Sequence, residues 1–454
     1  MKYERLSIAH YIERHPVAKE KEAYRASYCH VLTYMTRKYA AQDPYAGEVL
    51  RMFLKKLAPA DPDRTAGHDI SRSVKKAGAI QLKSFKLFTY RYQLILDCCF
   101  INGMADPGRT TSIKRELRQL FHARYHNKLE LFFRALYEDR AFTAPDFLHA
   151  SFQSWQANRQ FLSRQPVNLL VTGNMSAGKS TLLNALIGKK MNRTQSEACT
   201  ASLHYIHNKP FEDGLHAVWE DDLDLNAGHD KLLRHPAEIA GGKRYVGTYF
   251  RSPHLSSARL CVIDSPGVNY SLNAEHKELA YTAVREERFD KLIYVMNAEN
   301  IGSTDDRKYL SFIRETVPAN RVLFVLNKLD QFKPSEDSVA STMHALRQDL
   351  IGIGFPEPVV CPVSAYAGYL AKQRLYNEEL DEDESEELAL LVRKYKRPEY
   401  DLSAYYSADA PAAMSRLDQA GSGDRGEHGE AAAKYATLLR RAGISLLERL
   451  IGTY

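Results

Sequence analysis

The residues with the clearest chemical potential lie in one short segment, GNMSAGKST, residues 173–181. Gly173, Gly178, Lys179 and Ser180 fit the spacing G-x-x-x-x-G-K-[ST] of a phosphate-binding loop. The glycines let backbone N–H groups converge on a phosphate, and the lysine ammonium reaches the β- and γ-phosphates. A serine hydroxyl is an oxygen ligand of the kind that Mg²⁺ takes. The segment therefore predicts a site for a nucleoside triphosphate and Mg²⁺, lined further by Asn174, Met175, Ser176, Ala177 and Thr181.

The sequence on either side supplies the elements that such a loop requires. VNLLV (167–171) precedes the loop and predicts a strand, and STLLNALIG (180–188) follows it and predicts a helix. The N-terminus of that helix adds partial positive charge beside the phosphates.

A second motif, LCVIDSPG (260–267), follows later in the chain. Its Asp264 would hold Mg²⁺ through water, and the amide of Gly267 would contact the γ-phosphate. Asp-x-x-Gly alone also occurs at ordinary strand ends and turns. The motif is informative here because it follows an apolar strand and comes after the phosphate-binding loop in the chain.

Two further motifs predict the base. VLFVLNKLD (322–330) provides Asn327, Lys328 and Asp330 behind another apolar strand. The Asp330 carboxylate can accept hydrogen bonds from guanine N1 and N2, whereas adenine has no such donor pair. Lys328 can lie over the base plane, and CPVSAYAG (361–368) contributes Ser364 and Ala365, where a backbone amide would meet guanine O6. The four motifs in this order predict GTP or GDP.

A threonine that closes over Mg²⁺ and the γ-phosphate completes such a site. Thr200, in SEACTASLHYI, stands at the entry to an apolar segment and is favoured over Thr194. His204 and His207 follow it. Since no third ligand is near them in sequence, we interpret them as polar residues of an exposed strand rather than as a metal site.

The apolar pattern divides the chain into two regions. Residues 1–160 repeat apolar positions at three- and four-residue steps, which predicts an all-α helical bundle or partial stalk. Residues 161–454 alternate short β-rich runs with helical segments, which predicts an α/β domain with a mostly parallel sheet. Within it we expect an irregular insertion at about 369–430, with an acidic patch at Glu378–Glu387 and a disordered stretch, LDQAGSGDRGEHGEAAA.

Composition narrows the class of protein. The formal charge of the 454 residues is +6, but residues 1–160 hold 27 basic and 16 acidic side chains, a net charge of +11. A basic region suits an acidic membrane surface or nucleic acid, and a solvated helical face is the equal alternative. No apolar stretch approaches the roughly 20 residues of a spanning helix, and the N-terminus lacks the apolar core of a signal peptide. The six cysteines form no Cys-x-x-Cys pair, so we expect reduced thiols and a cytoplasmic location.

Several segments together resemble the dynamin superfamily, and most of all its bacterial dynamin-like proteins. They are GNMSAGKSTLLNAL, CTA, DSPG, VMNAEN with Asp305–Asp306–Arg307 shortly after it, and NKLD. The ending, LLRRAGISLLERLIG, resembles the helix that closes the GTPase domain of that family. The likeness covers about residues 160–454, and the helical lead-in is compatible with it.

The resemblance implies a large GTPase with weak nucleotide affinity, Mg²⁺, and often a K⁺ or Na⁺ ion at the phosphates. It implies activation through a homodimer of GTPase domains and movement of a helical region, usually at the periphery of a membrane. By the same resemblance, Ser176 would act at the β–γ bridging oxygen and the cation, and Thr200 would hold the attacking water. Asp264 and Gly267 would form the second switch.

Two features depart from that family. Met175 stands where eukaryotic dynamins carry a glutamine that helps to place the water, and a thioether donates no useful hydrogen bond. The chain also ends where the GTPase domain ends. We therefore expect a fragment, a reduced stalk, or a second dynamin-like chain that completes the stalk.

Two other functions stay open at this point. A regulatory GTPase switch that binds a protein or RNA partner would use the basic charge, although no KH-like or OB-like module follows and nucleic acid is the less favoured partner. A GTP-binding scaffold without hydrolysis is suggested by Met175, although Lys179, Ser180 and Asp264 are all present.

Overall fold

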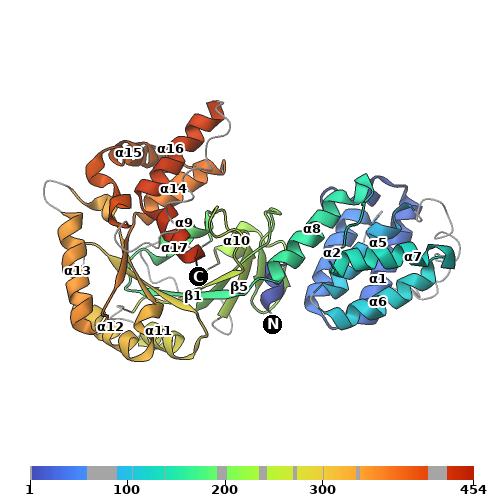
Figure 1. The fold of residues 1–454 in the computed structure, drawn as a ribbon, viewed down its shortest axis with the longest axis horizontal. Coiled ribbons are helices and arrows are strands. Elements are labelled where there is room, and N and C mark those ends of the chain that lie inside the picture. The colour runs from blue at the N-terminus through green and yellow to red at the C-terminus, as the bar shows by residue number, and fades with distance from the viewer. Residues whose placement is uncertain are drawn as a thin grey trace. The chain divides into compact units, whose positions relative to one another are not determined.

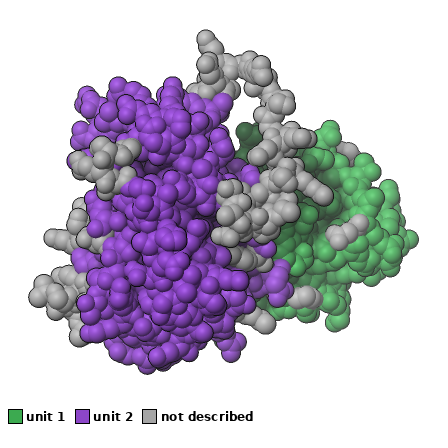
Figure 2. All heavy atoms as spheres, turned by 60° about the vertical axis from the view of Figure 1, so that its left-hand side comes forward, with its two compact units in different colours: residues 1–164, 210–217, 222–226 green, residues 165–209, 218–221, 227–454 purple. Residues whose placement is uncertain are grey.

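The computed structural model describes residues 3–58, 89–104, 106–138, 140–191, 202–234, 243–268, 274–299, 301–333, 338–406 and 427–453. The chain forms two compact units (Figure 2). Unit 1 comprises residues 1–164, 210–217 and 222–226, and unit 2 comprises residues 165–209, 218–221 and 227–454. The expected fold class, a helical region followed by an α/β domain with a mostly parallel sheet, is confirmed (Figure 1).

Unit 1 is built mainly from helices. They are η1 (Tyr3–Ser7), η2 (Pro16–Lys19), α1 (Glu22–Ala40), α2 (Pro44–Leu57), α5 (Arg91–Gly103), α6 (Pro107–Leu120), η4 (Ala123–Tyr125), α7 (His126–Tyr137), η5 (Asp146–Leu148) and α8 (His149–Leu162). The short strand β4 (Leu223–Asp224) belongs to its segment 222–226. Their apolar faces form a core that includes Tyr28, Leu32, Phe132 and Trp155, all fully buried.

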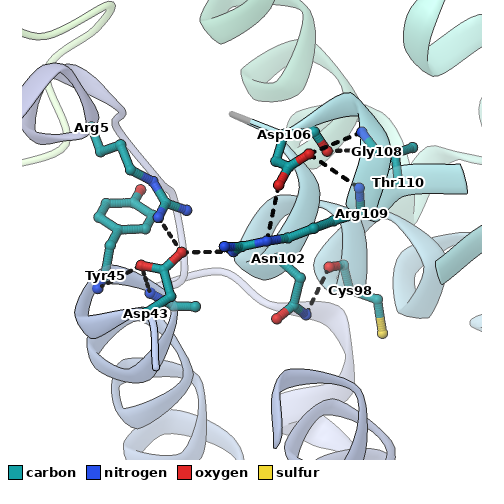
Figure 3. A network of polar contacts seen from close by, with 10 residues as sticks. Arg5, Asp43, Tyr45, Cys98, Asn102, Asp106, Gly108, Arg109 and Thr110 are labelled. Carbon is teal, nitrogen blue, oxygen red and sulfur yellow. Dashed lines mark hydrogen bonds and ion pairs between the residues drawn. The ribbon is translucent and has the colours of Figure 1, made fainter. Parts of the chain in front are cut away.

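Two of these helices begin with the same Asp-Pro signal (Figure 3). Asp43 and Asp106 each accept hydrogen bonds from two backbone amides of the turn that follows, which satisfies donors that a helix leaves free at its start. Arg109 connects them, with Nη1 2.7 Å from Asp43 Oδ2 and Nε 3.0 Å from Asp106 Oδ2. Arg5 also pairs with Asp43. The network therefore ties η1 to the starts of α2 and α6.

Unit 2 contains the sheet. Its strands are β1 (Val167–Gly173), β2 (Leu203–Asn208), β3 (Ala217–Trp219), β5 (Lys243–Thr248), β6 (Leu260–Asp264), β7 (Lys291–Asn297), β8 (Val322–Asn327) and β9 (Val359–Pro362). They lie in the order β3-β5-β2-β6-β1-β7-β8-β9. β6, β1, β7, β8 and β9 run parallel to one another, and β2 is antiparallel to β6. The carboxyl ends of β1, β6 and β8, where the predicted motifs follow, therefore lie at one edge.

The remaining elements of unit 2 are helices (Figure 1). They are α9 (Lys179–Ile187), α10 (His229–Leu232), α11 (Ala274–Glu286), α12 (Thr304–Thr316), η8 (Ala319–Arg321), η9 (Leu329–Gln331), α13 (Val339–Ile353), α14 (Ala365–Leu375), α15 (Glu382–Lys394), η10 (Pro398–Tyr400), η11 (Leu402–Tyr406), α16 (Glu427–Arg441) and α17 (Ile444–Gly452). α14 packs against both α9 and α16.

The segment expected to be irregular is largely helical where the structure describes it. α14 extends to Leu375 and α15 covers most of the acidic patch. The acidic residues have a local role, because Asp381 and Glu384 form a capping box and three acidic residues occupy the first turn of α15. In the stretch expected to be disordered, residues up to 426 lie outside the described residues, and α16 begins at Glu427.

Within the described ranges, no helix combines the length and apolar character that crossing a lipid bilayer requires.

Candidate functional site: a guanine-nucleotide pocket

The phosphate-loop residues follow β1 and end at the first turn of α9. Gly178 precedes that helix with φ of 84°, a conformation that strains any residue with a side chain. A Cβ atom at Gly178 would also lie 2.3 Å from Asn327 Nδ2. The glycine is therefore required both by the turn and by the approach of a residue that is 149 positions away in the chain. Ser180 and Thr181 lie half-buried in the first turn of α9.

The ammonium of Lys179 is held inside the loop. Lys179 is buried, and its Nζ donates to the carbonyl oxygens of Gly173 (3.2 Å) and Asn174 (3.0 Å). Burial lowers its pKa to about 8, against the opposing effect of Asp264. A phosphate group would supply the negative charge that this buried ammonium lacks.

The Asp264–Gly267 motif meets the phosphate loop. Asp264 ends β6, is 1% exposed, and lies opposite Val171 of β1 in the sheet. Burial raises the pKa of Asp264 to about 7, and Lys179 acts to lower it. A Cβ atom at Gly267 would lie 2.8 Å from Met175 N and 3.1 Å from Lys179 Nζ. Only a glycine permits this approach, so residues 264–267 and the loop form one site.

The donor set fits Mg²⁺. The Ser180 hydroxyl and the Asp264 carboxylate are oxygen ligands, and burial favours pairing the carboxylate with a cation because an isolated buried charge is costly. These are the residues that would hold the ion.

Asn327 joins the phosphate half of the site to the base half. Its Nδ2 donates to Ala177 O in the loop (2.9 Å), and its Oδ1 accepts from Ala365 N at the start of α14 (3.0 Å). Asn327 is buried at the end of β8. The Ala365 amide is thus engaged by Asn327, and a contact from this turn to guanine O6 would have to use a neighbouring amide.

The side chain of Asp330 has a fixed orientation. Ser364 Oγ donates to Asp330 Oδ1 at 2.7 Å, and Ser364 is itself the N-cap of α14. Lys328 adopts a left-handed conformation with φ of 68° just before the turn η9, and its side chain is half-buried. Each carboxylate oxygen has two acceptor sites, so Oδ1 can accept from Ser364 and still, together with Oδ2, accept from a base.

One residue at this site was missed by sequence reasoning. Lys394, at the end of α15, donates from Nζ to the carbonyl oxygens of Asp330 and Phe332. No motif signals it, because it lies 64 residues after Asp330 in a segment expected to be irregular.

The structure describes some of the other predicted residues and leaves others outside the described ranges. Thr200 and its competitor Thr194 lie outside the described residues. Ser176 is exposed with φ of 59°, and Met175 is half-buried beside Gly267. The Oδ1 atom of Asn174 is buried with no hydrogen-bond partner in the described part of the chain.

The expectation of an exposed strand for the two histidines is wrong. His204 is buried, and burial lowers its pKa to about 3; burial likewise lowers the pKa of His207 to about 4. β2 lies between β5 and β6, and residues Leu203–Ile206, whose side chains alternate between the two faces of the strand, are all buried. His204 Nε2 interacts with Ser202 Oγ at 3.0 Å, which gives it a local structural role.

Comparison with known proteins agrees with this geometry. A model of the dynamin family matches residues 169–329, from β1 to the guanine-recognition turn. Residues 169–329 thus match the dynamin family. The predicted family is thereby confirmed for the region that carries all the nucleotide motifs up to Leu329.

Two of the similar proteins are bacterial dynamin-like proteins. Dynamin-like protein A of Bacillus subtilis (strain 168) is 25% identical over 173 residues, which is 38% of this chain and 14% of that protein. A bacterial dynamin-like protein of Nostoc punctiforme is 26% identical over 257 residues, which is 52% of this chain and 34% of that protein. The chain thus matches about a third or less of the length of these relatives.

A solved structure is also similar over most of the chain. It is described as an oligomerised bacterial dynamin pair that provides a mechanism for long-range sensing and tethering of membranes. It shares 14% identity with this chain, covers 96% of it and 62% of its own chain, and has a TM-score of 0.37. A score of this size supports no detailed comparison of the two structures.

Proposed function

We propose that this dynamin-family chain binds GTP with Mg²⁺ and hydrolyses it. The observation that carries the proposal is the double contact of Asn327 with Ala177 O and Ala365 N. This contact joins the phosphate loop to the start of α14, where Ser364 Oγ donates to Asp330 Oδ1, the proposed acceptor for guanine. An ordinary strand end would not need to contact both the phosphate loop and the start of α14.

The residues divide the chemistry between them. Lys179 would neutralise the β- and γ-phosphates, and Ser180 and Asp264 would hold Mg²⁺, which supplies further charge neutralisation when bound. Asp330 would accept from guanine N1 and N2. Gly267 would contact the γ-phosphate through its amide, because its Cα lies against the phosphate loop.

Hydrolysis also requires a positioned water, and the Met175 thioether can donate no useful hydrogen bond to one. We propose that Thr200 positions the water and that pairing of two GTPase domains completes the site, with K⁺ or Na⁺ assisting at Ser176. The exposed position of Ser176 supports access by a cation or partner. The net charge of +11 in residues 1–160 supports a peripheral contact with an acidic membrane surface.

The first experiment measures GTP turnover per molecule against protein concentration, in K⁺ and then in a large organic cation. Turnover that rises with concentration and needs K⁺ is the expected result. Turnover that is slow and flat across concentration would contradict activation by pairing and would favour a switch that needs an outside activator.

Two variants test the site in the same assay. Lys179→Ala removes the buried ammonium and should abolish turnover. Lys190→Ala, an exposed lysine eleven positions along, should leave it unchanged. Normal turnover in Lys179→Ala would refute the site assignment.

A further inference from the structure

The turn that carries Asp330 is held by residues outside the nucleotide motifs. η9 is a single 3-10 turn, and Asp330 is only half-buried within it. Ser364 Oγ donates to Asp330 Oδ1 at 2.7 Å and so fixes one oxygen of the carboxylate. The backbone of the same turn has a separate partner, which comes from α15.

That partner is the ammonium of Lys394, which contacts two carbonyl oxygens of the turn. Nζ donates to Asp330 O and to Phe332 O, the latter at 3.1 Å. Carbonyl groups at the end of so short a turn have no helical partner, and a charged donor stabilises them more than a neutral donor does. Lys394 therefore restrains the backbone on both sides of Gln331.

Lys394 is itself held in place. Its Nζ lies 4.5 Å from the ring centroid of Tyr400, within the range of a cation–π contact. Just beyond α15, the carbonyl oxygens of Tyr395 and Lys396 each accept from Arg441 Nη1 of α16 at 2.8 Å. The end of α15 is thus anchored to α16, and the anchored lysine restrains the Asp330 turn.

We propose that Lys394 is a positioning residue that sets the selectivity of this pocket for guanine over purines that lack a 2-amino group. It holds the η9 backbone so that both carboxylate oxygens of Asp330 can meet the base. Guanine donates from N1 and from its 2-amino group, and a two-point contact with a carboxylate needs both oxygens in register. Hypoxanthine has only the N1 donor, so it gains less from a fixed carboxylate. The inference rests on the proposed function, because it takes guanine to bind at Asp330.

The test compares the affinities of GDP and inosine diphosphate by calorimetry. Lys394→Met removes the charge and the donors but keeps most of the stem. We expect its GDP affinity to fall about tenfold, because the released turn no longer holds both carboxylate oxygens in register, and its inosine diphosphate affinity to fall less. Lys396→Met is the matched control, because Lys396 is exposed and two positions away; both affinities should stay at the parent values.

The ratio of the GDP affinity to the inosine diphosphate affinity decides whether Lys394 sets the selectivity. An unchanged ratio in Lys394→Met, whether both affinities hold or fall together, would overturn it. Tyr400→Leu is a second variant that leaves Lys394 intact and removes the ring beside Nζ; it should lower the ratio in the same direction by a smaller factor. If Lys394→Met fails to fold, an unchanged ratio in Tyr400→Leu overturns the inference. Failure of the parent protein to bind GDP would instead refute the proposed function.

Discussion

Burial shifts the pKa values of the two charged residues at the phosphate end of the candidate site. Lys179 and Asp264 are both buried, and burial moves the pKa of each toward neutral pH, to about 8 and about 7. Each charge is partly supported by the other. A nucleotide and Mg²⁺ would supply the remaining countercharges, so binding should depend on pH near neutrality.

The pH dependence of Mg²⁺ binding follows from Asp264. A raised pKa means that the folded protein keeps this proton above pH 4, so ionising Asp264 between about pH 4 and 7 lowers stability. Mg²⁺ competes with the same proton. The gain in GDP affinity from Mg²⁺ should therefore increase as pH rises through about 7 and level off above it. Calorimetric titration of GDP with and without Mg²⁺ from pH 6 to 8.5 measures this.

The matched variants are Asp264→Asn and Asp349→Asn. Asp264→Asn removes the titrating group, so the added gain near pH 7 should disappear. Asp349 is an exposed partner of Arg307, and its variant should follow the parent. The same pH profile in all three proteins would show that the nucleotide alone sets it.

Asp330 should decide which base is bound. In Asp330→Asn the amide offers one donor and one acceptor, which matches the O2 and N1–H of xanthine instead of the two donors of guanine. We expect GDP affinity to fall about a hundredfold and xanthosine diphosphate to become the preferred ligand. Competition between the two diphosphates measures the preference, and retained preference for GDP would contradict the assignment of Asp330.

At the scale of elements, a buried ion pair connects the phosphate helix to the end of the chain. Lys372 of α14 pairs with Glu448 of α17, with side chains 1% and 2% exposed. Lys372 Nζ also donates to Leu186 O, in the last turn of α9, at 3.0 Å. Burial lowers the pKa of Lys372 and raises that of Glu448, and each partner opposes the shift of the other. The pair thus fixes the C-terminal end of the helix whose N-terminus carries the phosphate loop.

Replacing one member of this ion pair should lower the free energy of unfolding more than replacing both members. Lys372→Met leaves a buried carboxylate without its cation, and the free energy of unfolding should fall by about 3–5 kcal/mol. The double variant Lys372→Met/Glu448→Leu should lie closer to the parent. Urea unfolding followed by circular dichroism measures each. A double variant less stable than Lys372→Met would show that the charges themselves, rather than their pairing, stabilise the helices.

At the scale of the whole molecule, each unit has its own core and its own tryptophan. Trp155 is fully buried in unit 1, where its Nε1 donates to Leu136 O at 2.8 Å. Trp219 lies in β3, within the segment 218–221 of unit 2. These are the two tryptophans of the chain, so each can report on one unit.

Nucleotide should stabilise unit 2 selectively. A ligand that binds only the folded state at a hundredfold excess over its Kd adds about 2.7 kcal/mol to the stability of the unit that it binds. In Trp219→Phe, thermal unfolding followed by fluorescence reports Trp155 alone. We expect GDP to raise a calorimetric transition while the Trp155 midpoint stays unchanged. An equal rise at Trp155 would show that the two units unfold together.

Sequence alone predicted the candidate nucleotide site in outline. The phosphate loop, Asp264, Asn327 and Asp330 each follow an apolar strand, and parallel strands bring their carboxyl ends to one edge. Few residue types can bind phosphate or guanine. The types of these residues and their spacing therefore both predicted the nucleotide site. The strands at Val167, Leu260, Lys291, Val322 and Val359 were found for the same reason, because buried parallel strands are continuously apolar.

Only the tertiary structure decided the contacts that support these residues. Lys394 contacts the backbone of the Asp330 turn from a segment whose acidic composition suggested an irregular loop, although the capping box that begins this helix is a local feature. The burial of His204 depends on the packing of other elements over the face of β2 that carries it, which local polarity does not reveal. Lys372 and Glu448 pair across 76 positions. In each case the partner is distant in the chain, and local sequence pattern records a residue's neighbours only within a few positions.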